Sequence, residues 1–190
     1  MKRSILLATV LLAAAPAFAQ MQHGGAMSET TVRVGGQSMF PSKTIVANAV
    51  NSTDHTTLVA AVKAAGLVDT LNGPGPFTVF APTNAAFAAL PAGTVETLLK
   101  PENKAMLTKI LTYHVVAGDY DTTKLRAMIL AGNGTASLKT VAGGTLWLMM
   151  NGSSNITVKD EKGDIADLTI SDVNQSNGVI QVVDHVLLPG

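Results

Sequence analysis

The segment that most constrains the fold runs from residue 75 to residue 87 and reads GPFTVFAPTNAAF. Apolar residues alternate through residues 77–81, which predicts a strand that is at least half buried. Pro82 has no N–H group to donate, so we expect it to end the strand ladder. Thr83 or Asn84 can then cap a helix, because a side-chain oxygen there accepts an otherwise unpaired N–H group. The segment contains no ionisable side chain, which favours a structural corner over an active site.

The first residues have the pattern of an export signal. A positively charged start precedes an apolar run at residues 4–15, and residues 17–19 read A-F-A, a small-residue cleavage site. We therefore expect residues 1–19 to be a signal peptide removed at about Ala19, which makes the mature protein secreted, periplasmic or extracellular. The apolar run is too short to cross a bilayer and no later run is long enough, so no membrane span is predicted.

Charge and cysteine content exclude several classes of protein. The 13 Lys and Arg residues balance the 13 Asp and Glu residues of the whole chain, and nothing in this balance attracts nucleic acid. The chain has no cysteine, so disulfides are excluded despite the export signal. Stability must therefore come from an ordinary hydrophobic core.

Residues 20–38 are polar, contain glycine and lack periodicity, so we expect a flexible spacer followed by one folded domain over residues 39–190. Met21, His23 and Met27 lie close together in the spacer and are the chain's candidate metal ligands, since thioether and imidazole groups bind Cu(I). A mobile tail lacks the preorganisation of a metal site. The favoured interpretation is therefore a tail that binds no metal, and no cofactor is predicted.

The first part of the domain is predicted to be helical. Residues 44–50 form a short apolar helix, and Asp54 is expected to cap a second helix that ends at Gly66. His55 lies in the first turn of this second helix. We expect an exposed side chain there, with a proton switch as the alternative.

Tyr113 and His114 stand where the helix over residues 101–112 gives way to an extended segment. A general base needs a nucleophile and an orienting acid within reach. The chain has no cysteine and no nucleophile elbow, and valines follow His114. We expect a buried histidine whose nitrogens bond local groups, so the chain is predicted not to be an enzyme.

The C-terminal part is rich in strands joined by hairpin turns of the Gly-Gly, Asn-Gly and Lys-Gly type. The apolar segment at residues 147–150 is either a central strand or an exposed binding strip, and the central strand is the favoured interpretation. The final strand, expected over residues 178–189, is apolar on both faces and should lie between other strands. Adjacent strand residues point to opposite faces, which argues against a catalytic pair of Asp184 and His185.

Three of these segments together resemble the fasciclin domain. Residues 78–87 resemble its first motif box, Tyr113-His114 its central tyrosine-histidine motif, and residues 177–180 with 186–189 its second box. They occur in the family's order, and the resemblance covers about residues 42–190. It implies an α+β fold, a wedge-shaped β-sandwich with helices packed along one side. It gives Pro82, Thr83, Asn84 and His114 a scaffold role.

The same resemblance implies a secreted, non-catalytic adhesion or protein-interaction module. Its partner would be a surface or matrix protein or a glycan. Asp172-Val173 partly matches an aspartate-isoleucine pair that is tied to integrin binding in animal members, so this pair is a candidate partner contact. A single domain with a signal peptide and no cysteine also fits a bacterial source.

Two other classes of function remain as alternatives. A soluble extracytoplasmic ligand- or metal-binding protein would show polar groups converging on a sizeable apolar pocket. A hydrolase would show an acid and a nucleophile beside His114.

Overall fold

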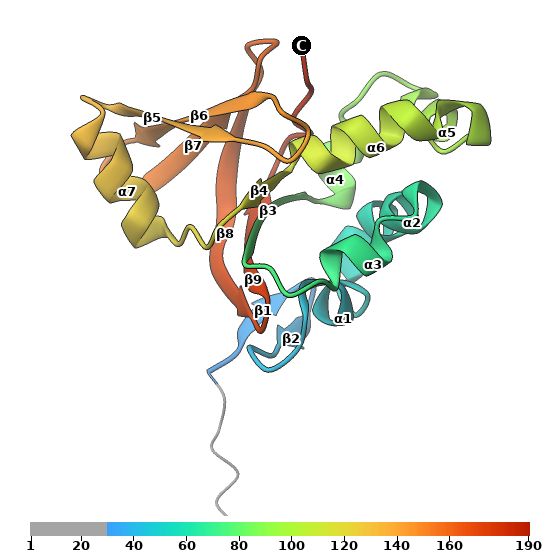
Figure 1. Ribbon diagram of the computed structural model, residues 1–190, viewed down its shortest axis with the longest axis horizontal. Coiled ribbons are helices and arrows are strands. Elements are labelled where there is room, and N and C mark those ends of the chain that lie inside the picture. Colours follow the sequence, from blue (N-terminus) through green and yellow to red (C-terminus); the bar gives the residue numbers. More distant parts are fainter. Residues whose placement is uncertain (1–29) are drawn as a thin grey trace, which may run out of the picture.

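The structure, a computed structural model, describes residues 30–190 (Figure 1). Its helices are α1 (Ile45–Ala49), α2 (Thr56–Ala65), α3 (Val68–Leu71), α4 (Asn84–Ala88), α5 (Thr94–Leu98), α6 (Lys104–Tyr113) and α7 (Thr122–Ala131), with short 3-10 turns η1 (Thr53–His55) and η2 (Pro101–Asn103). Its strands are β1 (Val32–Val34), β2 (Gln37–Met39), β3 (Phe77–Pro82), β4 (Val115–Ala117), β5 (Thr135–Lys139), β6 (Thr145–Asn151), β7 (Asn155–Lys159), β8 (Ile165–Gln175) and β9 (Gly178–Val183).

Within residues 30–190, β3 to β9 form one seven-stranded sheet in the order β4-β3-β9-β8-β7-β6-β5. β9 runs parallel to β3 and antiparallel to β8. The last strand therefore lies between two others, as its apolar character on both faces predicts. The hairpins β5–β6, β6–β7 and β7–β8 form at the three predicted turns.

The sheet curls until its two edge strands meet. β8 pairs with β7 through its first residues and with β9 through the rest, and register shifts around Ile170 accompany the change of partner. At the edges, Val116 of β4 forms a bridge with Thr140. The N–H of Val141 donates to the carbonyl of Val115 at 2.7 Å. The two halves of the sheet thus face each other, which confirms the predicted sandwich.

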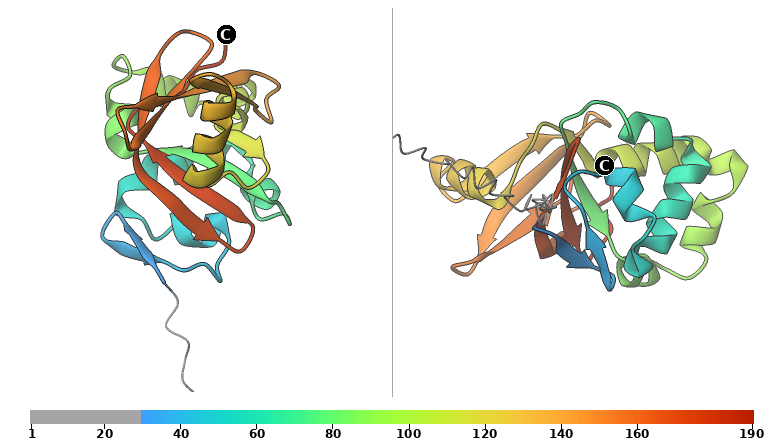
Figure 2. Two further views of the ribbon diagram at one scale, coloured as in Figure 1. Left: turned by 90° about the vertical axis from the view of Figure 1, so that its left-hand side faces the viewer. Right: turned by 90° about the horizontal axis from the view of Figure 1, so that it is seen from below.

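Two apolar cores hold this arrangement. One packs α1, α2, α4 and α6 against β3 and β9, and the other fills the curled sheet and is covered by α7. α1 to α6 lie on one side of the sheet, while α7 lies at the opposite end of the molecule (Figures 1 and 2). The predicted α+β fold with helices along one side is confirmed for α1 to α6. The sequence also predicts a helix over residues 122–130 capped by Asp121, and α7 forms there, but it lies apart from the other helices.

The prediction that residues 20–38 form a spacer is wrong for the part that the structure describes. Val32, Val34 and Met39 alternate with polar residues, and β1 and β2 pair as an antiparallel hairpin. Val34 and Met39 are 4% and 3% exposed, because the hairpin packs against the helical core. The folded domain therefore begins before residue 39. Met21, His23 and Met27 lie outside the described residues.

The prediction that Asp184 and His185 point to opposite faces is also wrong. β9 ends at Val183 and the chain then bends, so strand alternation no longer applies. Nδ1 of His185 lies 2.8 Å from Oδ1 of Asp184. The same carboxylate oxygen accepts the N–H of Asp167 at 2.8 Å. The pair is a surface contact that joins the end of β9 to β8.

Candidate functional site

The corner after β3 has the capping geometry that its sequence indicates. Pro82 pairs with Val183 of β9, and the N–H of Thr83 donates to the carbonyl of Val183 at 3.3 Å. Oγ1 of Thr83 then accepts the N–H of Ala86 at 3.3 Å, which satisfies a donor at the start of α4. One residue thus closes the strand and begins the helix.

Asn84 caps a different helix, α2. Its Oδ1 accepts the N–H of Thr57 at 3.0 Å, and its Nδ2 donates to the carbonyl of Thr53 at 2.9 Å. The prediction that Asp54 caps α2 is wrong, because Asp54 lies inside η1 and is exposed. The sequence pattern pointed to Asp54, which is next to α2 in the chain, whereas Asn84, which caps α2, is close to it only in space.

Replacing Thr83 and Asn84 together with alanine should lower the free energy of unfolding by about 2 kcal/mol, about 1 kcal/mol for each lost cap. The apolar faces of β3 and α4 stay intact in this variant, so the loss reports the hydrogen bonds. The urea midpoint measures it. Thr123→Ala is the control, since Thr123 is exposed on α7, and we expect a change below about 0.5 kcal/mol. Equal midpoints for the double variant and the wild type would contradict the capping role.

Tyr113 is fully buried at the end of α6. Its hydroxyl donates to the carbonyl of Thr145 at 2.8 Å and accepts the N–H of Glu161 at 3.1 Å. Burial raises the pKa of this hydroxyl to about 12. A Cβ atom at residue 144 would lie 2.5 Å from the ring, so the glycine at that position lets the ring pack against the β5–β6 turn. The tyrosine ties α6 to two hairpins.

His114 is 2% exposed, and both of its ring nitrogens are used. Nδ1 lies 2.9 Å from the carbonyl of Ile110, and Nε2 accepts the N–H of Leu187 at 2.9 Å. These partners assign the proton to Nδ1 of a neutral ring. Burial lowers the pKa of His114 to about 4. The histidine therefore links α6 to the C-terminal segment and has no nitrogen available for proton transfer.

Asp172 and Val173 do not form an exposed pair. Val173 is 1% exposed within the helical core. Oδ1 of Asp172 accepts the N–H of Thr122 at 2.8 Å and an N–H of Gln181 at 3.0 Å, and Oδ2 accepts the hydroxyl of Thr122. The carboxylate thus binds the first turn of α7. This geometry indicates a structural role for Asp172 and Val173 instead of the predicted contact with a partner.

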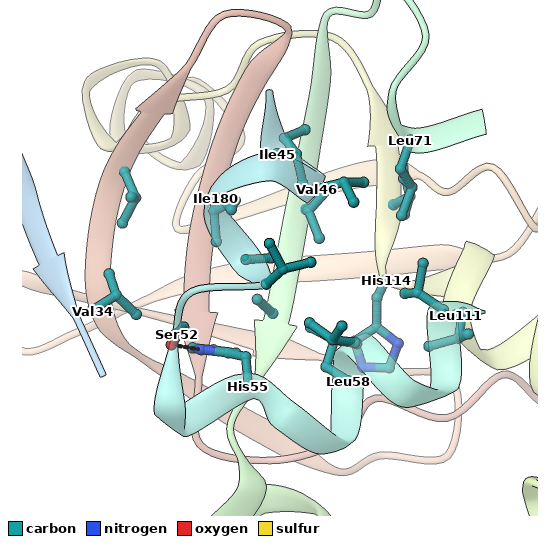
Figure 3. A pocket seen from close by; sticks show the side chains of 18 of the residues that line it. Val34, Ile45, Val46, Ser52, His55, Leu58, Leu71, Leu111, His114 and Ile180 are labelled. Carbon is teal, nitrogen blue, oxygen red and sulfur yellow. Dashed lines mark hydrogen bonds between the residues drawn. The ribbon is translucent and has the colours of Figure 1, made fainter. Parts of the chain in front are cut away.

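A cavity of about 240 Å³ lies between the helices, the β1–β2 hairpin and the sheet (Figure 3). His55 lines it and is 3% exposed, so the prediction of an exposed side chain is wrong. Nδ1 of His55 lies 2.8 Å from Oγ of Ser52, and this contact turns the ring inward at the end of η1. Nε2 has no hydrogen-bond partner within residues 30–190.

Sequence reasoning placed Asn177 in the second motif box but did not predict its role. Its Oδ1 accepts the N–H of Ile45 at 3.0 Å, and its Nδ2 donates to the carbonyls of Leu71 and Gly73 at 2.8 and 2.9 Å. The residue therefore joins α1, the loop after α3 and the turn before β9. An Asn-Gly pair reads as a turn in the sequence, and its long-range partners leave no local signal.

The sequence model of the fasciclin domain matches residues 53–189. The chain belongs to the fasciclin domain family. It is 49% identical to protein sll1483 of Synechocystis sp. over 85% of this chain and 82% of that protein. It is also 42% identical to the cell surface glycolipoprotein MPB83 of Mycobacterium bovis, over 65% of this chain and 48% of that protein.

A solved structure shows the same fold. It is the FAS1 domain pair of the insect cell adhesion molecule fasciclin I, with a TM-score of 0.56 and 24% identity. The match covers 69% of this chain and 43% of that chain. At this level of identity the likeness supports the fold alone.

The strand β6 of this fasciclin domain has one buried face and one partly exposed face. Leu146 and Leu148 are fully buried, whereas Trp147 and Met149 lie half-buried on the outer face of the sheet. Trp147 pairs across the strands with Ser137 and with the exposed Lys159. The segment is thus a strand between two others and also part of a surface.

A shallow hollow surrounds this tryptophan on the fasciclin domain. It has a volume of about 410 Å³, and we call it the outer-face hollow. Its lining residues are Thr135, Trp147, Met149, Lys159, Asp160, Glu161, Lys162 and Gly163.

Within residues 30–190, no group of three or more His, Asp or Glu side chains is placed to hold a metal ion. Over the same residues, no helix is both long enough and apolar enough to cross a membrane.

Proposed function

We propose that this chain is a secreted, non-catalytic adhesion or protein-interaction module that binds a surface or matrix protein or a glycan. The observation that carries the proposal is the outer-face hollow. It holds the chain's single tryptophan, which is half-buried and shares the hollow with Met149 and the exposed Lys159 and Lys162. Tryptophan combines a large apolar area with one hydrogen-bond donor, and such residues dominate the energy of many interfaces.

The motif residues support a scaffold role beneath this surface. The hydroxyl of Tyr113 and both nitrogens of His114 bond backbone groups. A group that acts in proton transfer needs a free position facing a substrate, and these side chains have none. The proposal therefore separates the residues that build the domain from those that bind.

Export supports the proposed location. The N-terminal signal pattern directs the chain out of the cytoplasm, and one relative, MPB83, is named a cell surface protein. A binding module at the cell surface or in the matrix fits both.

Trp147→Ala should reduce binding by about tenfold, as expected for removal of one aromatic anchor. The mature protein is coupled to beads, and the probe is the surface fraction of the organism that produces it, separated into protein and glycan parts. Retention on the beads is measured against the concentration of each part. Trp147→Phe, which keeps most of the apolar area, should keep most of the binding.

Leu130→Ala is the matched control, because Leu130 is 75% exposed on α7, away from the hollow. It should bind as the wild type does. The proposal fails if Trp147→Ala stays folded, as shown by its urea midpoint, and is retained as well as the wild type.

A further inference from the structure

The cavity between the helices and the sheet is large for a protein core. Its volume is about 240 Å³, whereas an engineered apolar cavity of about 150 Å³ already accepts benzene. Its walls come from α1, η1, α2, α3 and α6 and from strands β1, β2, β3, β4, β8 and β9. Ile45, Leu58 and Ile180 project into it from three of these elements (Figure 3). Well-packed interiors contain few voids larger than a water molecule, so a cavity of this size calls for an occupant.

One polar atom in this wall lacks a partner. Nε2 of His55 is the buried side-chain nitrogen or oxygen without a hydrogen bond in the part of the chain that the structure describes. The ring is anchored through Nδ1 to Ser52. Because a hydroxyl can donate or accept, Nε2 can present either a lone pair or an N–H group. The other histidine of the wall, His114, has both nitrogens bonded.

His55 is held neutral in this wall. Burial lowers its pKa, and the Ala81 backbone and the Asp54 carboxylate oppose this only in part. The Ala81 backbone is near enough to the ring to raise its pKa, but no group within residues 30–190 forms a hydrogen bond of ordinary geometry with Nε2. A single water molecule beside Nε2 would have too few hydrogen-bond partners, because buried waters typically make two to four hydrogen bonds to polar groups.

The cavity has an apolar entrance. Val46, Val59 and Val68 of its lining are partly exposed, and Val50 is 48% exposed. These side chains come from α1, α2 and α3, so the opening lies where the three short helices converge. Lys63 is the charged residue of the lining, and it is exposed. The buried walls therefore offer no charge to an ionic ligand.

We propose that this cavity binds a small neutral amphiphile, a compact hydrocarbon with one hydroxyl or carbonyl oxygen that bonds Nε2 of His55. The hydrocarbon fills the apolar volume, and the oxygen satisfies the unpaired nitrogen. This goes beyond the proposed adhesion role and does not depend on it, because the cavity and the outer-face hollow share no lining residue.

The test compares 1-naphthol with naphthalene, which differ by one hydroxyl group. Binding to the ¹⁵N-labelled mature protein is followed by NMR. Both probes should shift amides of α1, α2 and α3, and the indole signal of Trp147 should stay in place as an internal control. In His55→Phe, the affinity ratio of naphthol to naphthalene should fall about tenfold, because the hydroxyl is then buried without a partner.

A second pair of variants tests the cavity itself. Ala49 lines the cavity on α1, whereas Ala47 of the same helix is exposed and does not. Ala49→Phe should abolish binding of both probes, and Ala47→Phe should bind them as the wild type does. The proposal is overturned if the wild type binds neither probe, if the shifts centre on Trp147, or if the affinity ratio is unchanged in His55→Phe.

Discussion

His114→Ala is expected to lower the free energy of unfolding by about 3 kcal/mol. The substitution leaves the N–H of Leu187 and the carbonyl of Ile110 without their ring partners in the dry interior. It also leaves a cavity, since the imidazole is 2% exposed. Loss of a buried partner costs more than the hydrogen bond itself, because the remaining group stays desolvated.

Urea unfolding at pH 7 measures this loss. His185→Ala is the matched control, because His185 is exposed and bonds the neighbouring Asp184 at the surface. We expect that variant to stay within about 0.5 kcal/mol of the wild type. Equal midpoints for the two histidine variants would show that the buried network contributes little.

The linked protonation of His114 should also cost the domain about 3 kcal/mol of stability between pH 7 and pH 4. The pKa of His114 is about 4 in the folded protein, below the ordinary histidine value of 6.5, and each unit of this difference corresponds to about 1.4 kcal/mol. The unfolded chain takes up the proton first. Stability is therefore complete above about pH 6.5, falls as the pH drops towards 4, and levels off below that for this group. The lowered pKa of His55 acts in the same direction.

His114→Gln isolates this contribution. Glutamine does not titrate, and all carboxylates are the same in both proteins. The difference in unfolding free energy between wild type and variant should therefore shrink as the pH falls from 7 to 4. Urea midpoints at pH 7, 5.5 and 4 give that difference. Parallel curves would mean that His114 is not kept neutral by burial.

The sequence predicted those parts of the fold whose signals are local. The segment over residues 77–87 carries its own strand alternation, its proline and its cap, and β3 and α4 follow them. The sequence of β9 is apolar on both faces, which predicts that the strand lies between two others. Each of these properties is set by neighbours along the chain, so no knowledge of the tertiary structure is needed.

Interactions between distant segments were not predictable in this way. Asn84 caps α2 from 27 residues away, and Asn177 bonds Ile45 across 132 residues. Local capping rules pointed instead to Asp54. The β1–β2 hairpin was missed because its strands have three residues each, too few to show periodicity. Its apolar residues are buried only because the helical core covers them.

His55 was misjudged for a related reason. A first-turn histidine is normally exposed, but here a contact with Ser52 and the packing of η1 turn the ring inward. The cavity that it lines depends on side chains from eleven helices, turns and strands. No single stretch of sequence contains that information.

The central claim is that the motif residues build the domain and that the outer-face hollow binds the partner. The most direct test measures how much of the separated surface fraction the bead-coupled protein retains per folded molecule. Trp147→Ala and the Thr83→Ala/Asn84→Ala variant are compared with wild type, and urea midpoints on the same preparations give the folded fractions. We predict that Trp147→Ala loses about tenfold in binding at an unchanged midpoint. The corner variant should have a lower midpoint and wild-type binding per folded molecule. The account is contradicted if the corner variant loses binding while folded and Trp147→Ala keeps it.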